Sequence, residues 1–153
     1  MRYLFFSLGF TIIHTIAYTI AGMLALKISK DLYEEKERLL DFIRDMSDET
    51  DRKHVTKWFM PAQLLRGLLM SFALYPILGL LGNISFIFRF IFFSSLMFIY
   101  TDFSSAVPFP NNIEGLVYMK SRYQKKNLFW KLYYEMIIYS LLFSILTSWL
   151  LFL

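Results

Sequence analysis

The chain has 153 residues, of which 57% are hydrophobic and 20% aromatic, and its net charge is +4. Cysteine is absent, which excludes disulfides, thiolate catalysis and cysteine-ligated metals. The 16 basic residues are diluted by 12 acidic ones, which favours charged flanks of membrane helices over a basic face that binds nucleic acid. The apolar residues gather in blocks, as is typical of an integral membrane protein.

The first expected membrane span covers residues 3–26. It is almost wholly apolar, and a bilayer-crossing helix needs about 20 such residues. We interpret it as a retained helix, since a signal-peptide core is shorter. Residues 27–60 are polar, with four apolar side chains at helical spacing: Leu32, Leu39, Ile43 and Met46. No glycine or proline interrupts the passage between the two segments. The first helix is therefore expected to extend into the cytoplasm, with a break near residues 47–51.

Residues 67–101 contain one charge, Arg89, and one turn signal, the Gly-Asn pair at 82–83. Two short spans that fold back at this pair account for the whole stretch, whereas a single span leaves a surplus. The second and third spans are therefore expected at 64–81 and 84–101. Proline inside a helix removes a hydrogen bond, so Pro76 is expected to kink the second span.

A polar loop at 102–128 and a fourth span at 130–153 complete the chain. Nine Lys or Arg residues lie within 27–66 and five within 102–131, while the turn at 82–83 has none. Positive charge stays on the cytoplasmic side, so both basic connections are expected inside and both termini outside. The sequence thus predicts an all-α integral membrane protein, a single four-helix bundle over residues 1–153.

Small residues lie four apart on the first and fourth spans: Ala17, Ala21, Ala25, Ser140, Ser144 and Ser148. Such rows let helices approach closely, and serines add hydrogen bonds across the contact. The contact lies either within one bundle or between subunits of a homo-oligomer, and the spacing leaves both open.

Two ionisable residues inside the expected spans are functional candidates, because charge is costly there. His14 has Thr11, Thr15 and Tyr18 within one turn, and is either a neutral residue bonded to these hydroxyls or a proton-linked or pore-lining group. Arg89 either reaches the lipid headgroups or faces inward to pair within the bundle or ring a permeation path. We expect no metal at either residue.

A third set of candidates lies at the expected cytoplasmic face: Arg66, Asp102, Asn111, Asn112 and Glu114. They are expected to converge, because the ends of the second and third spans meet there. One interpretation is that Arg66 pairs with Asp102 while the amides cap helices, with Asn112 before a helix at 113–123. The other is a binding site for a lipid phosphate or a partner protein.

The chain contains no hydrolase elbow, nucleotide-binding loop or zinc-protease motif. The leading hypothesis is a non-enzymatic, homo-oligomeric membrane subunit without cofactor, which docks a soluble cytoplasmic protein through its cytoplasmic helix and loop. In size and number of spans, the chain is similar to membrane components of bacterial anti-phage systems, such as the membrane subunit of Kiwa. This similarity implies a role in anti-phage defence at a bacterial inner membrane.

Two alternatives remain open. One is an oligomeric pore or channel, holin-like or ion-conducting, with His14 or Arg89 in its lumen. The other is a small membrane enzyme or lipid-binding protein that uses the face formed by Arg66, Asp102 and Glu114.

Overall fold

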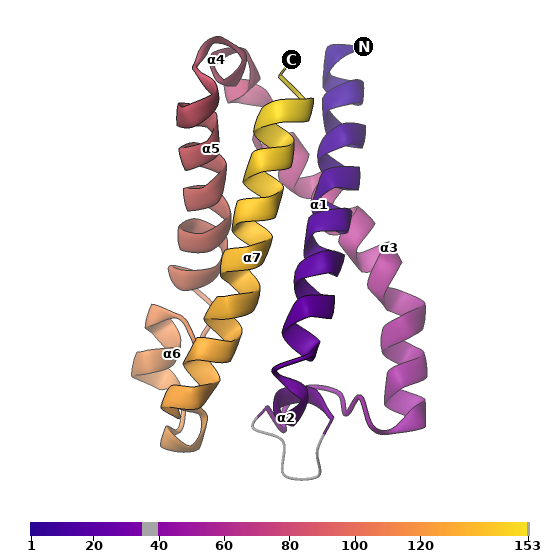
Figure 1. Cartoon of the computed structure of the whole chain (residues 1–153), viewed down its shortest axis with the longest axis vertical. Helices are drawn as coiled ribbons and strands as arrows, with labels where there is room; N and C mark the ends of the chain where they lie inside the picture. Colours follow the sequence, from indigo (N-terminus) through magenta and orange to yellow (C-terminus); the bar gives the residue numbers. More distant parts are fainter. Residues whose placement is uncertain (35–39, 153) are drawn as a thin grey trace.

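The computed structural model describes residues 1–34 and 40–152, and within these ranges the chain is helical, with no strand. Four helical stretches run along the molecule (Figure 1): α1 (Arg2–Leu26), α3 (Glu49–Ala73), α5 (Phe86–Ser95) continued by the π-helical segment η2 (Leu96–Phe103), and α7 (Lys126–Leu150). Shorter helices connect them: α2 (Lys30–Tyr33), α4 (Leu78–Asn83) and α6 (Ile113–Tyr118).

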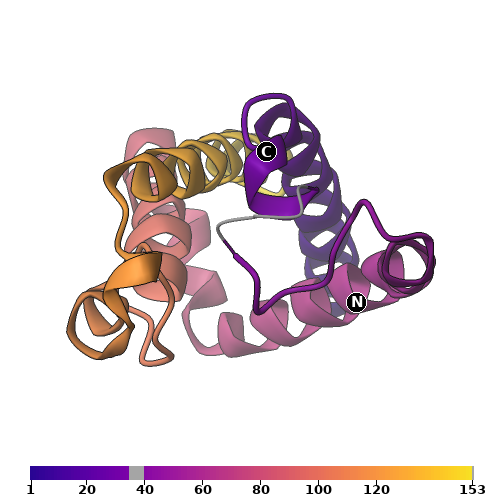
Figure 2. The same ribbon diagram turned by 90° about the horizontal axis from the view of Figure 1, so that it is seen from below.

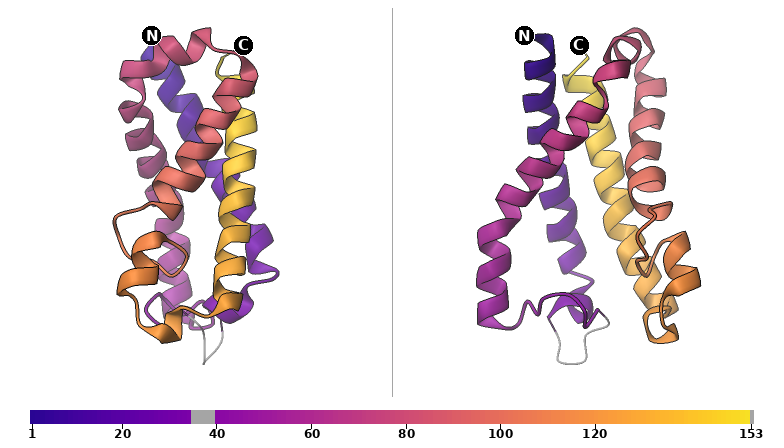
Figure 3. Two further views of the ribbon diagram at one scale, coloured as in Figure 1. Left: turned by 90° about the vertical axis from the view of Figure 1, so that its left-hand side faces the viewer. Right: turned by 180° about the vertical axis from the view of Figure 1, so that it is seen from behind.

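The long helices follow one another around an arc. α1 packs against α3 on one side and α7 on the other, and α7 also packs against α5, as Figure 2 shows from below. Both termini and α4 lie at one end, which we call the terminal end (Figure 1). The opposite end, formed by residues 27–34, 40–48 and 104–125, is called the loop end. Figure 3 shows the first half of α3 diverging from α1 toward the loop end.

The bundle is held by apolar side chains between α1, α5 and α7. Phe10, Phe93 and Phe143 have no accessible surface, and their rings contact one another at centroid distances of 4.9 to 6.4 Å. Large apolar residues also cover the outer surface, as α1 illustrates with Leu4, Leu8, Ile12 and Ile16. A soluble monomer rarely exposes such a continuous patch, whereas a lipid-facing helix does.

Three helical stretches are long and apolar enough to cross a membrane: α1, Phe86–Phe103 and α7. A fourth candidate is α3 together with Tyr75–Asn83, which meet at a bend of 46°. The bend falls at a 3-10 turn, Tyr75–Ile77, that contains Pro76. The predicted kink at Pro76 is therefore confirmed, and its cause is the missing backbone N–H of proline.

The expected extension of the first helix into the cytoplasm is wrong. α1 ends at Leu26, and the chain then folds back under the bundle. Leu32 and Leu40 are buried there against Leu128 and Leu132 at the start of α7. A straight extension would leave these leucines in water, so tertiary burial overrides the helical pattern of the segment.

Among the described residues of the polar segment 27–60, those at 30–33 and from Glu49 onward are helical. The predicted break near 47–51 is confirmed, because α3 starts there: the Asp48 carboxylate accepts a hydrogen bond from the Asp51 N–H at 2.9 Å. From Glu49 the helix runs without a stop into the expected second span. Leu39, one of the four residues of the expected apolar stripe, lies outside the described residues.

The alanine and serine rows contact neighbours within the single chain. All six side chains are at most 2% exposed: Ala17, Ala21, Ala25, Ser140, Ser144 and Ser148. Of the two interpretations, contact within one bundle therefore holds. These rows offer no surface to a second subunit.

Candidate functional site

A cavity of about 200 Å³ opens between α1, α3, α7 and the segments of the loop end. Polar side chains from several helices and from the loop end meet there. Seven polar side chains of the described residues line it: Tyr18, Tyr33, Arg66, Thr101, Asp102, Asn111 and Glu135. Three of them, Arg66, Asp102 and Asn111, belong to the set predicted from the sequence.

Arg66 lies on α3 and reaches toward α1. Its guanidinium carbon stands 5.4 Å from the centre of the Tyr18 ring, a cation–π contact. The expected pairing with Asp102 does not form. No ion pair within 4.0 Å joins Arg66 to Asp102 or Glu135 in the described ranges, although all three line the cavity. The cavity thus keeps one cation and two carboxylates apart.

Asp102 lies near the end of η2 and is bonded to the loop. The Asn111 Nδ2 donates to Asp102 Oδ2 at 2.8 Å, and the Tyr133 hydroxyl donates to the Asn111 carbonyl at 2.8 Å. Asn111 is 1% exposed, and its Oδ1 atom has no hydrogen-bond partner among the described residues. A buried acceptor without a donor is costly, so Asn111 Oδ1 is an unpaired acceptor of a residue that lines the cavity.

Asn112 has a different role, because its side chain holds the loop itself. Its Oδ1 accepts from the Gly115 N–H at 2.7 Å and from the Phe109 N–H at 3.0 Å, and its Nδ2 donates to the Val107 carbonyl at 2.7 Å. The predicted cap at Asn112 is confirmed. A side chain on Gly115 would place its Cβ 1.8 Å from the Phe109 carbonyl oxygen, so only glycine fits there.

The helix expected at 113–123 is shorter than predicted. α6 ends at Tyr118, and the Gln124 Nε2 then donates to the carbonyls at its end, including those of Gly115 and Met119. Glu114 lies in the first turn of α6 and is not among the residues that line the cavity. The predicted convergence therefore fails for Glu114.

Glu135 on α7 is the charged residue that the sequence analysis missed. Its Oε2 accepts a hydrogen bond from the Tyr33 hydroxyl at 3.2 Å, and its Oε1 lies 3.9 Å from the Cβ position of Gly22 on α1. Burial, followed by the Glu135 carboxylate, raises the pKa of Tyr33. The sequence does indicate it as a candidate, because Glu135 is an acidic residue within the expected fourth membrane span. Lys131, one turn earlier, does not neutralise it, because its ammonium is bound to Asp31.

His14 is not part of this cavity. It is fully buried, and its Nδ1 lies 2.7 Å from the Tyr139 hydroxyl on α7. The hydroxyls expected as its partners are engaged elsewhere or unpaired: Thr15 donates to the Thr11 carbonyl at 2.9 Å. The interpretation of His14 as a bonded core residue is favoured, with Tyr139 as the partner that the sequence did not indicate.

Arg89 lies at the terminal end and pairs within the chain, as one of its interpretations proposed, with backbone carbonyls as partners. Its Nη1 donates to the carbonyls of Ile84 at 3.0 Å and Leu81 at 3.3 Å, and its guanidinium lies 5.1 Å from the centre of the Phe152 ring. These carbonyls close the end of α4, where helical partners are lacking. Arg89 therefore anchors the turn between the second and third expected spans.

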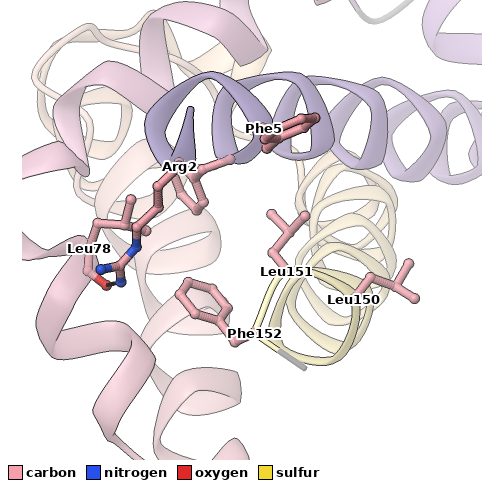
Figure 4. A pocket seen from close by; sticks show the side chains of 7 residues that line it. Arg2, Phe5, Leu78, Leu150, Leu151 and Phe152 are labelled. Atoms are coloured by element: carbon pink, nitrogen blue, oxygen red, sulfur yellow. Dashed lines mark hydrogen bonds between the residues drawn. The ribbon is translucent and has the colours of Figure 1, made fainter.

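A second cavity, of about 280 Å³, lies at the terminal end (Figure 4). Arg2 reaches across it and donates to the Leu78 carbonyl at 3.2 Å, and the remaining walls are apolar side chains such as Phe5, Leu151 and Phe152. Its one charged group is thus engaged with the α4 backbone. The cavity at the loop end remains the stronger candidate.

No family model matches this chain, and neither does any curated protein or solved structure. The function is therefore argued from the geometry of the loop-end cavity and from the membrane-compatible helices.

Proposed function

We propose that the protein is a membrane-embedded binding protein that takes a small polar molecule or a lipid headgroup into the cavity at the loop end. The supporting observation is that Arg66, Asp102 and Glu135 meet there from three different helical segments without an ion pair between the arginine and either acid. Ionisable side chains are costly within membrane helices and mark functional sites by default.

The proposal includes four membrane spans, with α3 and Tyr75–Asn83 together as the bent second span. It puts the loop end in the cytoplasm and both termini outside. Its support is the charge distribution, nine Lys or Arg within 27–66 and five within 102–131, together with the two termini at the same end of the bundle. The inner membrane of a bacterium remains the predicted location.

The other predicted functions lose the features that suggested them. The extended cytoplasmic helix that was to dock a partner is replaced by a folded-back segment, and the small-residue rows are buried within the chain. His14 and Arg89, the candidate pore residues, are both bonded inside one chain. Docking of a soluble protein, homo-oligomerisation and a role in anti-phage defence stay predictions. No reaction is part of the proposal.

The membrane arrangement is testable because the natural chain has no cysteine. Asn83 and Ser121 are exposed at opposite ends of the bundle, so Asn83→Cys and Ser121→Cys report the two sides. A membrane-impermeant maleimide should label Asn83→Cys on intact cells and Ser121→Cys only on inverted vesicles. Labelling of both from the same side would contradict four spans.

The binding function is tested by native mass spectrometry of the full chain, released gently from its own host membrane. The wild-type protein should carry one small molecule or lipid, and the Asp102→Asn/Glu135→Gln double variant should lose it, since both substitutions keep shape and remove charge. Glu114→Gln is the matched control, because its carboxylate lies outside the cavity. The proposal would be overturned if the wild-type protein carried no bound molecule, or if the double variant kept it.

A further inference from the structure

We infer that the loop-end cavity recognises a primary ammonium group, held by Asp102, Asn111 and Glu135. The group can belong to a soluble amine or to the ethanolamine headgroup of a phospholipid. This inference rests on the proposed binding function and names the class of its ligand.

The free acceptor atoms of the cavity residues match the donors of a primary ammonium group. Asn111 Nδ2 donates to Asp102 Oδ2, and the Tyr33 hydroxyl donates to Glu135 Oε2. Each carboxylate therefore keeps a second oxygen for a ligand. The Oδ1 of Asn111, a side chain 1% exposed, is a third acceptor without a donor. The three residues that carry these acceptors line one cavity from η2, the following loop and α7. A primary ammonium has three N–H donors and no acceptor, which fits this set.

The net charge of the cavity residues also favours a cation. With all three groups ionised, one positive charge on Arg66 and two negative charges on Asp102 and Glu135 leave a net formal charge of −1 at the cavity. A monocation neutralises it. A simple anion would be attracted by Arg66 but repelled by both carboxylates, and repulsion is strong where water is scarce.

The aromatic walls and the small volume of the cavity suit a small organic cation. Tyr33 and Phe109 line it with aromatic surface, which favours organic cations through cation–π contacts. Its volume of about 200 Å³ is below the roughly 300–1,000 Å³ of pockets that take drug-sized ligands. A headgroup or small amine therefore fits better than a larger molecule.

The two sources of the ammonium group differ in whether their binding involves Arg66. A soluble amine needs only the three acceptors. An ethanolamine phospholipid also carries a phosphate next to its ammonium, and among the described residues Arg66 is the cation on the cavity wall that suits a phosphate. A substitution at Arg66 thus separates the two sources.

The test uses the full-length protein in nanodiscs and compares probes with and without N–H donors. Ethanolamine is compared with choline, and phosphatidylethanolamine with phosphatidylcholine, because the quaternary ammonium keeps the charge but cannot donate. Bound probe is counted by native mass spectrometry. We expect the ethanolamine member of at least one pair to bind about tenfold more tightly, the scale of a charge-assisted hydrogen bond.

The variants then identify the site. Asp102→Asn and Glu135→Gln should each remove this preference, while Glu114→Gln should keep it. Loss of lipid binding in Arg66→Gln, with no competition by free ethanolamine, indicates the phospholipid. Binding of ethanolamine that survives Arg66→Gln indicates a soluble amine. Only variants whose thermal unfolding matches the wild-type protein are compared, and two independent acids keep the test decisive if one variant does not fold.

Equal binding of choline and ethanolamine probes, or a preference for inorganic phosphate, would overturn the inference. If a native ligand is found on the wild-type protein and neither ethanolamine probe binds, this inference fails while the proposed binding function stands. If no native ligand and no probe binds, both fail.

Discussion

His14 Nδ1 and the Tyr139 hydroxyl lie 2.7 Å apart and join α1 to α7 inside the bundle. The same hydroxyl is 3.3 Å from the Met97 sulfur on η2, so one oxygen contacts two other helical segments. His14 and Tyr139 have no accessible surface. This contact is therefore a structural tie, and its removal is expected to weaken the bundle without reaching the loop-end cavity.

Tyr139→Phe should lower the free energy of unfolding by about 1 kcal/mol, within the range of interhelical hydrogen bonds in membranes. The loss arises because His14 Nδ1 would be left unpaired in the core. Unfolding by a denaturing detergent measures it, with Tyr134→Phe, an exposed tyrosine on the same helix, as the control. Equal stability of the two variants would show that the hydrogen bond contributes nothing.

Gly67→Ala should destabilise the contact between α1 and α3 by about 1–3 kcal/mol, the usual effect of overpacking. An added Cβ would lie 3.0 Å from the Thr11 Cα and 3.1 Å from the His14 ring. Gly79→Ala is the matched control, since nothing lies within 4 Å of its Cβ position. Because alanine favours helix, Gly79→Ala should be neutral or stabilising in the same unfolding assay. If both substitutions changed the free energy of unfolding in the same direction, the close approach of α1 and α3 at Gly67 would be contradicted.

Gly115→Ala should disrupt the loop that presents Asn111, because the Phe109 carbonyl occupies the place of the new side chain. We expect faster proteolysis between residues 104 and 112 and weaker ligand binding, while the membrane helices remain folded by circular dichroism. Gly79→Ala again provides the control. Unchanged proteolysis would mean that the loop has room at this position.

The stability of the protein should fall as the pH rises above about 10, the ordinary pKa of tyrosine. Burial and the Glu135 carboxylate raise the pKa of Tyr33, so the unfolded chain loses this proton before the folded one does. The unfolded state then binds fewer protons, and stability declines with pH until the folded group ionises. Detergent unfolding across this range should show a smaller decline for Tyr33→Phe. An identical decline would assign the effect to other groups.

Local patterns in the sequence predicted much of the fold. The apolar blocks, the proline at 76 and the capping residues near Asp48 each act on their own neighbourhood, and their consequences appear in the helices and the bend. The path of residues 27–34 and 40–48 was not predictable in this way. It depends on Leu32 and Leu40 meeting Leu128, a residue almost at the other end of the chain.

The candidate site was predicted in part for the same reason. Arg66, Asp102 and Asn111 come together because the ends of the second and third expected spans are neighbours. Glu135 was not predicted, because its place at the cavity depends on Tyr33, a residue far away in the sequence. Glu114 was expected nearby, but it lies in the first turn of α6, and α6 contributes no residue to the cavity lining.

The direction in which Asp102 points depends on the π-helical segment Leu96–Phe103. Its wider turns, marked by the hydrogen bond from the Ser104 N–H to the Ile99 carbonyl at 2.7 Å, accommodate an extra residue compared with an α-helix. If the same residues formed an ordinary α-helix, Asp102 would lie about 100° further around the helix axis. The span would keep its hydrophobicity, and the carboxylate would leave the cavity. Among chains of this kind, the π-helical segment, more than the presence of an aspartate, would distinguish those that keep the site.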